Sequence, residues 1–262
     1  MRYRIRVAYD GTDYFGWQVQ PHRPTVQQKL ELALTRLTGA TVKVHGSGRT
    51  DQGVHACGQV AHFDLGTAWE PRLLVKGLNA LLPPDIRVLQ AARAPAGFHA
   101  RRLALGKEYR YFIWNAPVMD PCRRRYWVHV YKPLDVHRMQ AAAALLVGRH
   151  DFSALTANPN REVGSTVRVL RKLTVRKRGR EIVITAASDG FLYRMVRSIC
   201  GLLIRVGEGA ETPAGVRDIL ASRVRTARVP TAPPQGLFLW RVWYGRGIVA
   251  ACAPTTRVGE RE

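Results

Sequence analysis

The residues best suited to chemistry lie in a glycine-rich stretch in the first quarter of the chain. Residues 45–56 read His-Gly-Ser-Gly-Arg-Thr-Asp-Gln-Gly-Val-His-Ala, which places Arg49 two residues before Asp51. Glycine adopts backbone conformations closed to other residues and lets another chain approach closely. A carboxylate in such a loop could act as a nucleophile, or Arg49 and Asp51 could simply pair within a tight turn. The composition of the stretch leaves both interpretations open.

Short apolar runs on both sides predict rigid elements that hold this loop. Residues 41–44 (Thr-Val-Lys-Val) precede it and residues 58–65 follow it, and both runs are predicted to be strands. Catalytic groups are commonly carried on loops that a rigid scaffold positions. If the segment is extended, the side chains of Arg49 and Asp51 point to the same side.

The rest of the chain mixes predicted strands and helices in two halves of similar composition. The first half is predicted to contain strand 2–7, a helix between Thr25 and Gly39, strands 41–44 and 58–65, helix 71–82, and strands 86–91 and 109–113. The second half is predicted to contain a helix capped by Asp135, strands 167–175 and 182–187, helix 192–206, a helix from Thr212-Pro213 and strand 237–244. We expect an α+β architecture of two similar halves with joined sheets. The first half is expected to span residues 1–105 and to contain the glycine-rich loop, and the second half is expected to span residues 106–245. Residues 246–262 are expected to form a flexible tail.

The charge balance indicates a polyanionic partner. Lys and Arg number 41 against 19 acidic residues, a formal net charge of +22. An enzyme of small neutral metabolites has no need for this excess. Binding of nucleic acid does, because each neutralised phosphate releases condensed counterions. A generally basic proteome is the alternative explanation.

Targeting, membrane and metal signals are missing from the sequence. The N-terminus lacks the apolar run of a signal peptide, and no stretch approaches the roughly 20 apolar residues of a membrane span. The cysteines are far apart in the sequence: Cys57, Cys122, Cys200 and Cys252. This spacing argues against a disulfide framework and favours reduced thiols in the cytoplasm. His55, Cys57 and His62 fit no standard zinc spacing, so we expect no metal site and structural roles for the histidines.

Residues 46–56 resemble the signature loop of the TruA family of tRNA pseudouridine synthases, G-A-G-R-T-D-x-G-V-H-A, with Ser47 where the family usually has alanine. Further matches follow in the family's order over nearly the whole chain: Tyr9 to Thr12 with Gly16 to Gln18 and Thr25 to Gln27, Lys107 to Tyr111, His150 to Phe152, and Gly190 to Arg197. The resemblance implies the pseudouridine synthase fold, with a central mixed, mainly antiparallel sheet, helices packed on it and a basic cleft between the halves.

The resemblance also implies an activity and a nucleophile. The family isomerises uridine to pseudouridine at positions 38–40 of the tRNA anticodon stem-loop, and its single required aspartate matches Asp51. The reaction detaches the base, rotates it and rejoins it through carbon. A carboxylate can begin this by adding to the pyrimidine ring or by assisting glycosidic cleavage. Both chemical routes remain open.

The resemblance implies four substrate-binding residues: Arg49, Tyr109, Arg197 and, in the stretch Pro-Pro-Gln-Gly-Leu at residues 233–237, Leu237. Arg49 would help to displace the target base, although phosphate contact or pairing with a carboxylate remains an alternative. Tyr109 would stack on the extruded pyrimidine. Arg197 would pair with Asp51, and Leu237 would lie beneath the base, a position that core packing explains equally well.

No metal or organic cofactor is implied, because Asp51 and the substrate's own ring supply the chemistry. The family works as a homodimer in which one tRNA spans both subunits. Arg194 stands where many relatives have histidine, so a second cation is expected to face the RNA. Two alternatives are a non-catalytic tRNA-binding or folding protein and a metal-dependent nuclease that uses Asp51 and nearby histidines. The intact Asp51, Tyr109 and Arg197 argue against the first, and the lack of an acidic cluster argues against the second.

Overall fold

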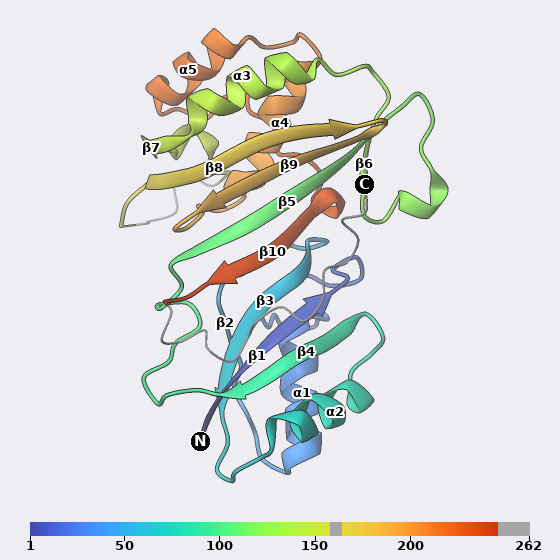
Figure 1. Cartoon of the computed structure of the whole chain (residues 1–262), viewed down its shortest axis with the longest axis vertical. Coiled ribbons are helices and arrows are strands. Elements are labelled where there is room, and N and C mark those ends of the chain that lie inside the picture. The colour runs from blue at the N-terminus through green and yellow to red at the C-terminus, as the bar shows by residue number, and fades with distance from the viewer. Residues whose placement is uncertain (158–163, 246–262) are drawn as a thin grey trace.

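A ten-stranded sheet runs through the computed structural model, which describes residues 1–157 and 164–245 (Figure 1). Its order is β4-β1-β3-β10-β5-β9-β8-β7, with β2 paired to β3 and β6 paired to β5. The strands are β1 Arg2–Tyr9, β2 His45–Gly46, β3 His55–Asp64, β4 Ile86–Arg93, β5 Gly106–Asn115, β6 Val128–Val130, β7 Gly148–Asp151, β8 Val167–Arg178, β9 Glu181–Ser188 and β10 Leu237–Trp243. The β10–β3 and β5–β6 pairs are parallel and the others are antiparallel. The expected α+β class with a mixed, mainly antiparallel sheet is therefore confirmed, whereas the predicted tail at residues 246–262 lies outside the described residues.

Strand β10 joins the two halves of the sheet. It pairs in parallel with β3, where Leu239 lies opposite Ala56, and antiparallel with β5, where Leu239 lies opposite Tyr109. Ala56, Leu239 and Tyr109 therefore lie side by side in three neighbouring strands. Because the glycine-rich loop ends where β3 begins, this register brings the loop next to the middle of β5.

In the described part of the chain, five helices cover the two ends of the sheet. They are α1 Val26–Thr38, α2 Pro71–Leu81, α3 Val136–Leu146, α4 Met195–Gly207 and α5 Pro213–Ser222, with single 3₁₀ turns at Pro121–Arg123, Ser153–Leu155 and Pro234–Gly236. Helices α1 and α2 lie beside β1 and β4, and α3, α4 and α5 lie at the end that contains β8 and β9 (Figure 1). The side chains of Thr25, Asp135 and Thr212 each accept a backbone hydrogen bond in the first helical turn, and Gly39 ends α1 with φ 73°. These predicted helix ends are confirmed.

The predicted strand at residues 41–44 is wrong, because its backbone groups bond to a helix instead of a sheet. The N–H of Val44 donates to the Glu31 carboxylate at 3.0 Å, and the carbonyl oxygen of Val44 accepts from the Gln27 side chain at 3.0 Å. Both partners lie on α1. Val42 and Val44 are buried. An alternating apolar pattern indicates that one face of a segment is buried, but it does not identify the hydrogen-bonding partner of the backbone.

The predicted helix at 192–206 begins three residues late, at Met195. Arg194 has a φ of 55°, in the left-handed region that non-glycine residues seldom adopt, so the helix cannot extend back through it. The apolar residues before it pack without helical structure. The left-handed turn also places two arginines, Arg194 and Arg197, at the beginning of α4.

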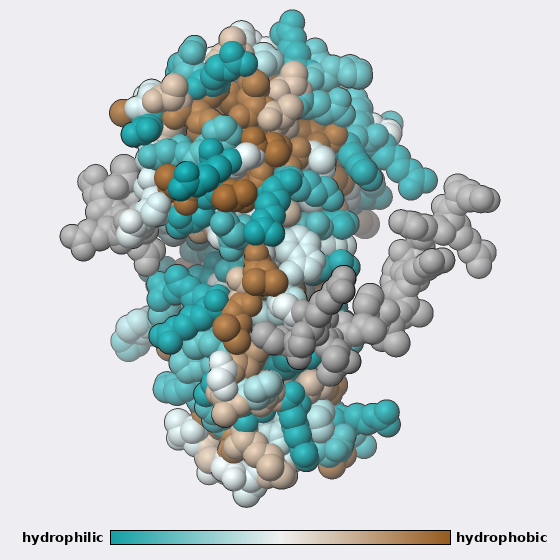
Figure 2. All heavy atoms as spheres, turned by 60° about the vertical axis from the view of Figure 1, so that its left-hand side comes forward, coloured by the Kyte–Doolittle hydropathy of each residue, from teal (hydrophilic) through white to brown (hydrophobic). Residues whose placement is uncertain are grey.

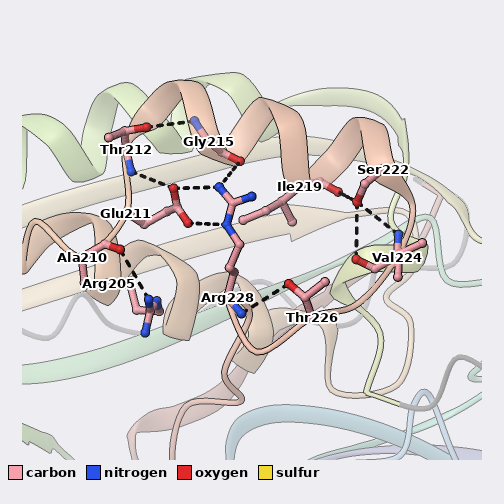
Figure 3. Close-up of polar contacts among 10 residues, drawn as sticks. All are labelled: Arg205, Ala210, Glu211, Thr212, Gly215, Ile219, Ser222, Val224, Thr226 and Arg228. Atoms are coloured by element: carbon pink, nitrogen blue, oxygen red, sulfur yellow. Dashed lines mark hydrogen bonds and ion pairs between the residues drawn. The ribbon is translucent and has the colours of Figure 1, made fainter.

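Helix α5 is followed by a segment that an ion-pair network connects to the residues just before the same helix (Figure 3). The Glu211 carboxylate accepts hydrogen bonds from Arg228 Nε at 2.8 Å and Nη2 at 3.0 Å, and from the N–H of Thr212 at 2.9 Å. Within the same segment, Arg225 donates to the Ser198 hydroxyl of α4 at 2.8 Å. These contacts hold the segment before β10 against α4.

The surface at the β7–β8 side of the molecule is largely hydrophilic (Figure 2). Hydrophobic side chains on this face gather over the upper half and in a narrow band at the waist, whereas hydrophilic side chains cover much of the rest. Across residues 1–157 and 164–245, each helix is too short or too polar to cross a bilayer.

Candidate active site

Strand β3 anchors the glycine-rich loop through one buried glutamine. Gln59 Nε2 donates to the carbonyl oxygen of Gly48 at 2.8 Å, and its Oε1 accepts from the Ser47 hydroxyl at 2.6 Å. The N–H of Ser47 donates to the carbonyl oxygen of Val60 at 2.7 Å. Ser47 and Gln59 are both fully buried. The loop is therefore built into the sheet at its first residues, and a serine at position 47 gains a hydrogen bond that alanine would lack.

A second segment, residues 9–17, supports the loop from the other side. Tyr9 and Thr50 share a hydrogen bond between their hydroxyl groups at 2.9 Å, and the N–H of Trp17 donates to the carbonyl oxygen of Thr50 at 3.1 Å. Gly16 has a φ of 87°, and a Cβ there would lie 2.5 Å from the Thr50 carbonyl oxygen. Only glycine permits this approach. The glycine and aromatic residues upstream of the loop thus hold it in place.

Asp51 is oriented by arginines from the start of α4. Its Oδ2 accepts a hydrogen bond from Arg197 Nη1 at 3.1 Å and lies 3.9 Å from Arg194 Nε. Arg197 is itself fixed, because its Nε donates to the carbonyl oxygen of Ala232 at 2.8 Å. The Asp51 side chain is 21% exposed and that of Arg197 is 11% exposed. The carboxylate is consequently held in a defined orientation and stays accessible.

Tyr109 and Leu237 supply aromatic and apolar surface close to this carboxylate. The ring of Phe191 packs edge-on against the Tyr109 ring, with centroids 5.2 Å apart. Burial, with Tyr9 and Asp51 nearby, raises the pKa of the Tyr109 hydroxyl, so this group stays protonated at neutral pH. Leu237 is 4% exposed and begins β10. Tyr111 is fully buried and donates to the carbonyl oxygen of Pro233 at 2.9 Å, as expected of a core residue.

One cavity of about 990 Å³ brings the five sequence-predicted residues together. Its lining includes Arg49, Asp51, Tyr109, Arg197 and Leu237. A smaller cavity of about 440 Å³ shares Asp51, Arg194 and Arg197 with the larger one and adds Arg124 and Arg125. Asp51 therefore lies where two arginine-lined spaces meet. Such a site can present a nucleophilic carboxylate to a planar ring and bind the phosphates that flank it.

Sequence reasoning missed part of this lining. Arg124 and Arg125 belong to a visible run of three arginines, yet nothing in their position along the chain connects them with Asp51. Lys107 and Arg101 also line the larger cavity. From the sequence, Lys107 is visible only as the first residue of the stretch Lys107 to Tyr111. Its position next to the loop depends on the register of the strands. Arg194 lines both cavities, and its contact with RNA stays a prediction.

The two histidines beside the loop bond to the backbone. His55 Nδ1 lies 3.0 Å from the backbone nitrogen of Gly11 and 3.1 Å from Asp10 Oδ1, and its Nε2 lies 3.1 Å from the carbonyl oxygen of Gln235. Burial lowers the pKa of His55. His62 Nδ1 accepts from the N–H of Ala100 at 3.2 Å, and burial lowers the pKa of His62 to about 4. Within residues 1–157 and 164–245, no three His, Cys, Asp or Glu side chains are grouped as metal ligands.

A family model and related protein sequences point to the same family. Residues 5–101 and 142–245 match the family model described as tRNA pseudouridine synthase. Three relatives, each named tRNA pseudouridine synthase A, are similar over most of their length. The protein from Geotalea uraniireducens is 46% identical over 92% of this chain and 98% of its own, and that from Brevibacillus brevis is 47% identical over 93% and 99%. The protein from Maridesulfovibrio salexigens is 41% identical over 100% and 96%.

Proposed function

The chain belongs to the tRNA pseudouridine synthase family of isomerases, and we propose that it acts at positions 38–40 of the tRNA anticodon stem-loop with Asp51 as nucleophile. The observation that carries the proposal is the ion pair between Asp51 and Arg197 at 3.1 Å in the larger cavity. A carboxylate in this position is oriented toward the space that Tyr109 and Leu237 line, where a flipped base would lie.

The proposed reaction rearranges bonds without any net gain or loss of atoms. The bond from C1′ of the ribose to N1 of uracil breaks, and a bond from C1′ to C5 forms. The proton on C5 is lost and N1 gains one. Asp51 starts this exchange either by adding to the pyrimidine ring or by attacking at C1′. Because product and substrate are isomers, neither an oxidant nor a reductant is consumed, and we propose that no cofactor is required.

Each of the other cavity residues has a separate role in binding the target nucleotide or in orienting Asp51. Arg49, two residues before Asp51, enters the space that the extruded base leaves in the stack. Tyr109 stacks on the extruded base, and its protonated hydroxyl is available as a hydrogen-bond donor. Leu237 forms the apolar floor beneath the base. Arg197 keeps Asp51 oriented through its second bond, to Ala232.

The proposed partner is tRNA, bound by a homodimer in the cytoplasm. The formal net charge of +22 supports a long electrostatic footprint on RNA. One tRNA spanning both subunits would contact more basic surface than a single cavity offers.

The direct test is incubation of the purified protein with an unmodified tRNA transcript in the presence of EDTA. We expect pseudouridine at one or more of positions 38–40, mapped by sequencing after chemical modification of pseudouridine. A transcript with cytidine at these positions is the control and should stay unmodified. Pseudouridine only elsewhere would refute the proposed site, and activity that requires added metal would refute the metal-free chemistry.

Binding is expected to depend steeply on salt. Log affinity plotted against log salt concentration should fall with a slope of about −0.7 to −0.9 for each phosphate that the protein neutralises. Fluorescence anisotropy of labelled tRNA over a range of potassium chloride concentrations measures this slope. An almost flat dependence would contradict an extended basic footprint and leave only a small local site.

A further inference from the structure

Lys107 is a cavity residue that the proposed function does not use. It lies on β5 two residues before Tyr109, so both side chains project from the same face of the strand. The side chain is half-buried and lines the larger cavity with Arg49, Asp51 and Arg101. Within residues 1–157 and 164–245, the amine of Lys107 has no carboxylate within ion-pair distance and makes no hydrogen bond.

The amine of Lys107 lies against the loop that carries Asp51. A Cβ built on Gly48 would come within 2.9 Å of Lys107 Nζ. Glycine has no side chain, so the Lys107 amine can occupy the space next to position 48. The Gln59 side chain donates to the carbonyl oxygen of Gly48 at 2.8 Å, which fixes this part of the loop beside the lysine.

The electrostatic surroundings of Lys107 favour an incoming anion. Burial, together with the nearby guanidinium of Arg101, lowers the pKa of Lys107 to about 8. The carboxylates on the neighbouring elements are engaged elsewhere: Asp51 pairs with Arg197, and Asp189, which follows β9, accepts from the Ser188 hydroxyl at 3.0 Å. A partly desolvated cation beside other cations is costly unless an anion neutralises it. A phosphate-bearing ligand in the cavity would supply such an anion.

We propose that Lys107 Nζ binds a backbone phosphate of the target nucleotide while the base stacks on Tyr109, an inference that rests on the proposed function. Two residues along a strand span roughly 7 Å, a distance comparable to the reach of one nucleotide from its base to its phosphate. A lysine ammonium acts as a compact point charge that suits a phosphate oxygen. Lys107 is thus a positioning residue that fixes the backbone of the flipped nucleotide.

The pH dependence of kcat/KM separates this role from a structural one. A lysine with a lowered pKa is charged below that pKa and neutral above it. Since kcat/KM reports groups of the free enzyme, it should fall as the pH rises through about 8. Lys107→Arg should remove this fall, because guanidinium stays protonated. Lys107→Met should lower kcat/KM by about 10- to 100-fold at neutral pH, with a much smaller change in kcat.

The exposed Lys172 on β8 is the matched control, and Lys172→Met should leave both constants unchanged. Thermal unfolding of each variant identifies any loss through misfolding. If Lys107→Met proves unstable, the Lys107→Arg profile still decides the question. A wild-type profile that does not fall near pH 8, or a fall that persists in Lys107→Arg, would overturn the proposal.

A double-mutant cycle, in which one phosphate charge and the Lys107 charge are removed separately and together, then identifies the phosphate that Lys107 binds. Stem-loop RNAs with a neutral methylphosphonate on the 5′ or the 3′ side of the target uridine are titrated into Asp51→Asn and Asp51→Asn/Lys107→Met proteins. One methylphosphonate should weaken binding by about 10- to 100-fold in the first protein and hardly at all in the second. Independent, additive losses for both RNAs would overturn the proposal. Absence of pseudouridine formation by the wild-type enzyme would instead refute the proposed function, because the binding cycle needs no turnover.

Discussion

Asp51→Asn is expected to abolish pseudouridine formation and to leave tRNA affinity within a few-fold of the wild-type value. The amide keeps the shape of the carboxylate and still offers Arg197 an oxygen acceptor at the same position. It lacks the negative charge that makes the carboxylate a nucleophile. Turnover should fall by at least about 10⁴-fold, the scale on which other enzymes lose activity when a nucleophile or its partner is removed.

Release of tritium from tRNA labelled at C5 of uridine measures this loss, because the proposed reaction removes the proton from C5. Asp85→Asn is the matched control. Asp85 accepts from the Tyr14 hydroxyl at 2.7 Å and lines neither cavity, so this variant should keep wild-type turnover. If Asp51→Asn retained a substantial part of the activity, a residue other than Asp51 would be the nucleophile.

Arg197→Met is expected to produce the next largest loss. Arg197 bonds to Asp51 and to the carbonyl oxygen of Ala232 at the same time, so methionine removes both the orienting donor and its anchor. A nucleophile displaced by about 1 Å can lose roughly 100-fold in rate. We therefore expect kcat to fall by about 100-fold and tRNA affinity to change much less, since Arg197 is mostly buried.

Single-turnover kinetics with saturating enzyme measures the chemical step of this variant apart from binding. Arg197→Lys keeps the charge but has a single amine, which cannot reproduce the guanidinium fork, so it should recover only part of the rate. Arg205→Met alters an arginine on the same helix that lines neither cavity, and it should leave kcat unchanged. Loss of tRNA affinity with an intact chemical step would mean that Arg197 binds phosphate and does not orient Asp51.

The sequence by itself determined the features that depend on neighbours within one or two turns. Thr25, Gly39, Asp135 and the pair Thr212-Pro213 mark helix ends, because capping involves groups only a few residues apart. The glycine-rich loop, the excess of basic residues and the mixture of strands and helices are equally readable from the chain. The matches to the pseudouridine synthases added what local patterns lack, namely the candidate roles of Asp51 and its partners.

Only the tertiary structure decided which distant groups meet. The bond between Arg197 and Asp51 joins residues 146 positions apart, and the packing of Lys107 against Gly48 depends on the register of β5 through β10 to β3. At residues 41–44, side chains of α1 take the place of a neighbouring strand. Hydrophobic periodicity states which face of an element is buried, but it does not state which element covers that face or supplies its hydrogen bonds. Those choices are made by the packing of the whole chain, and they position the candidate site.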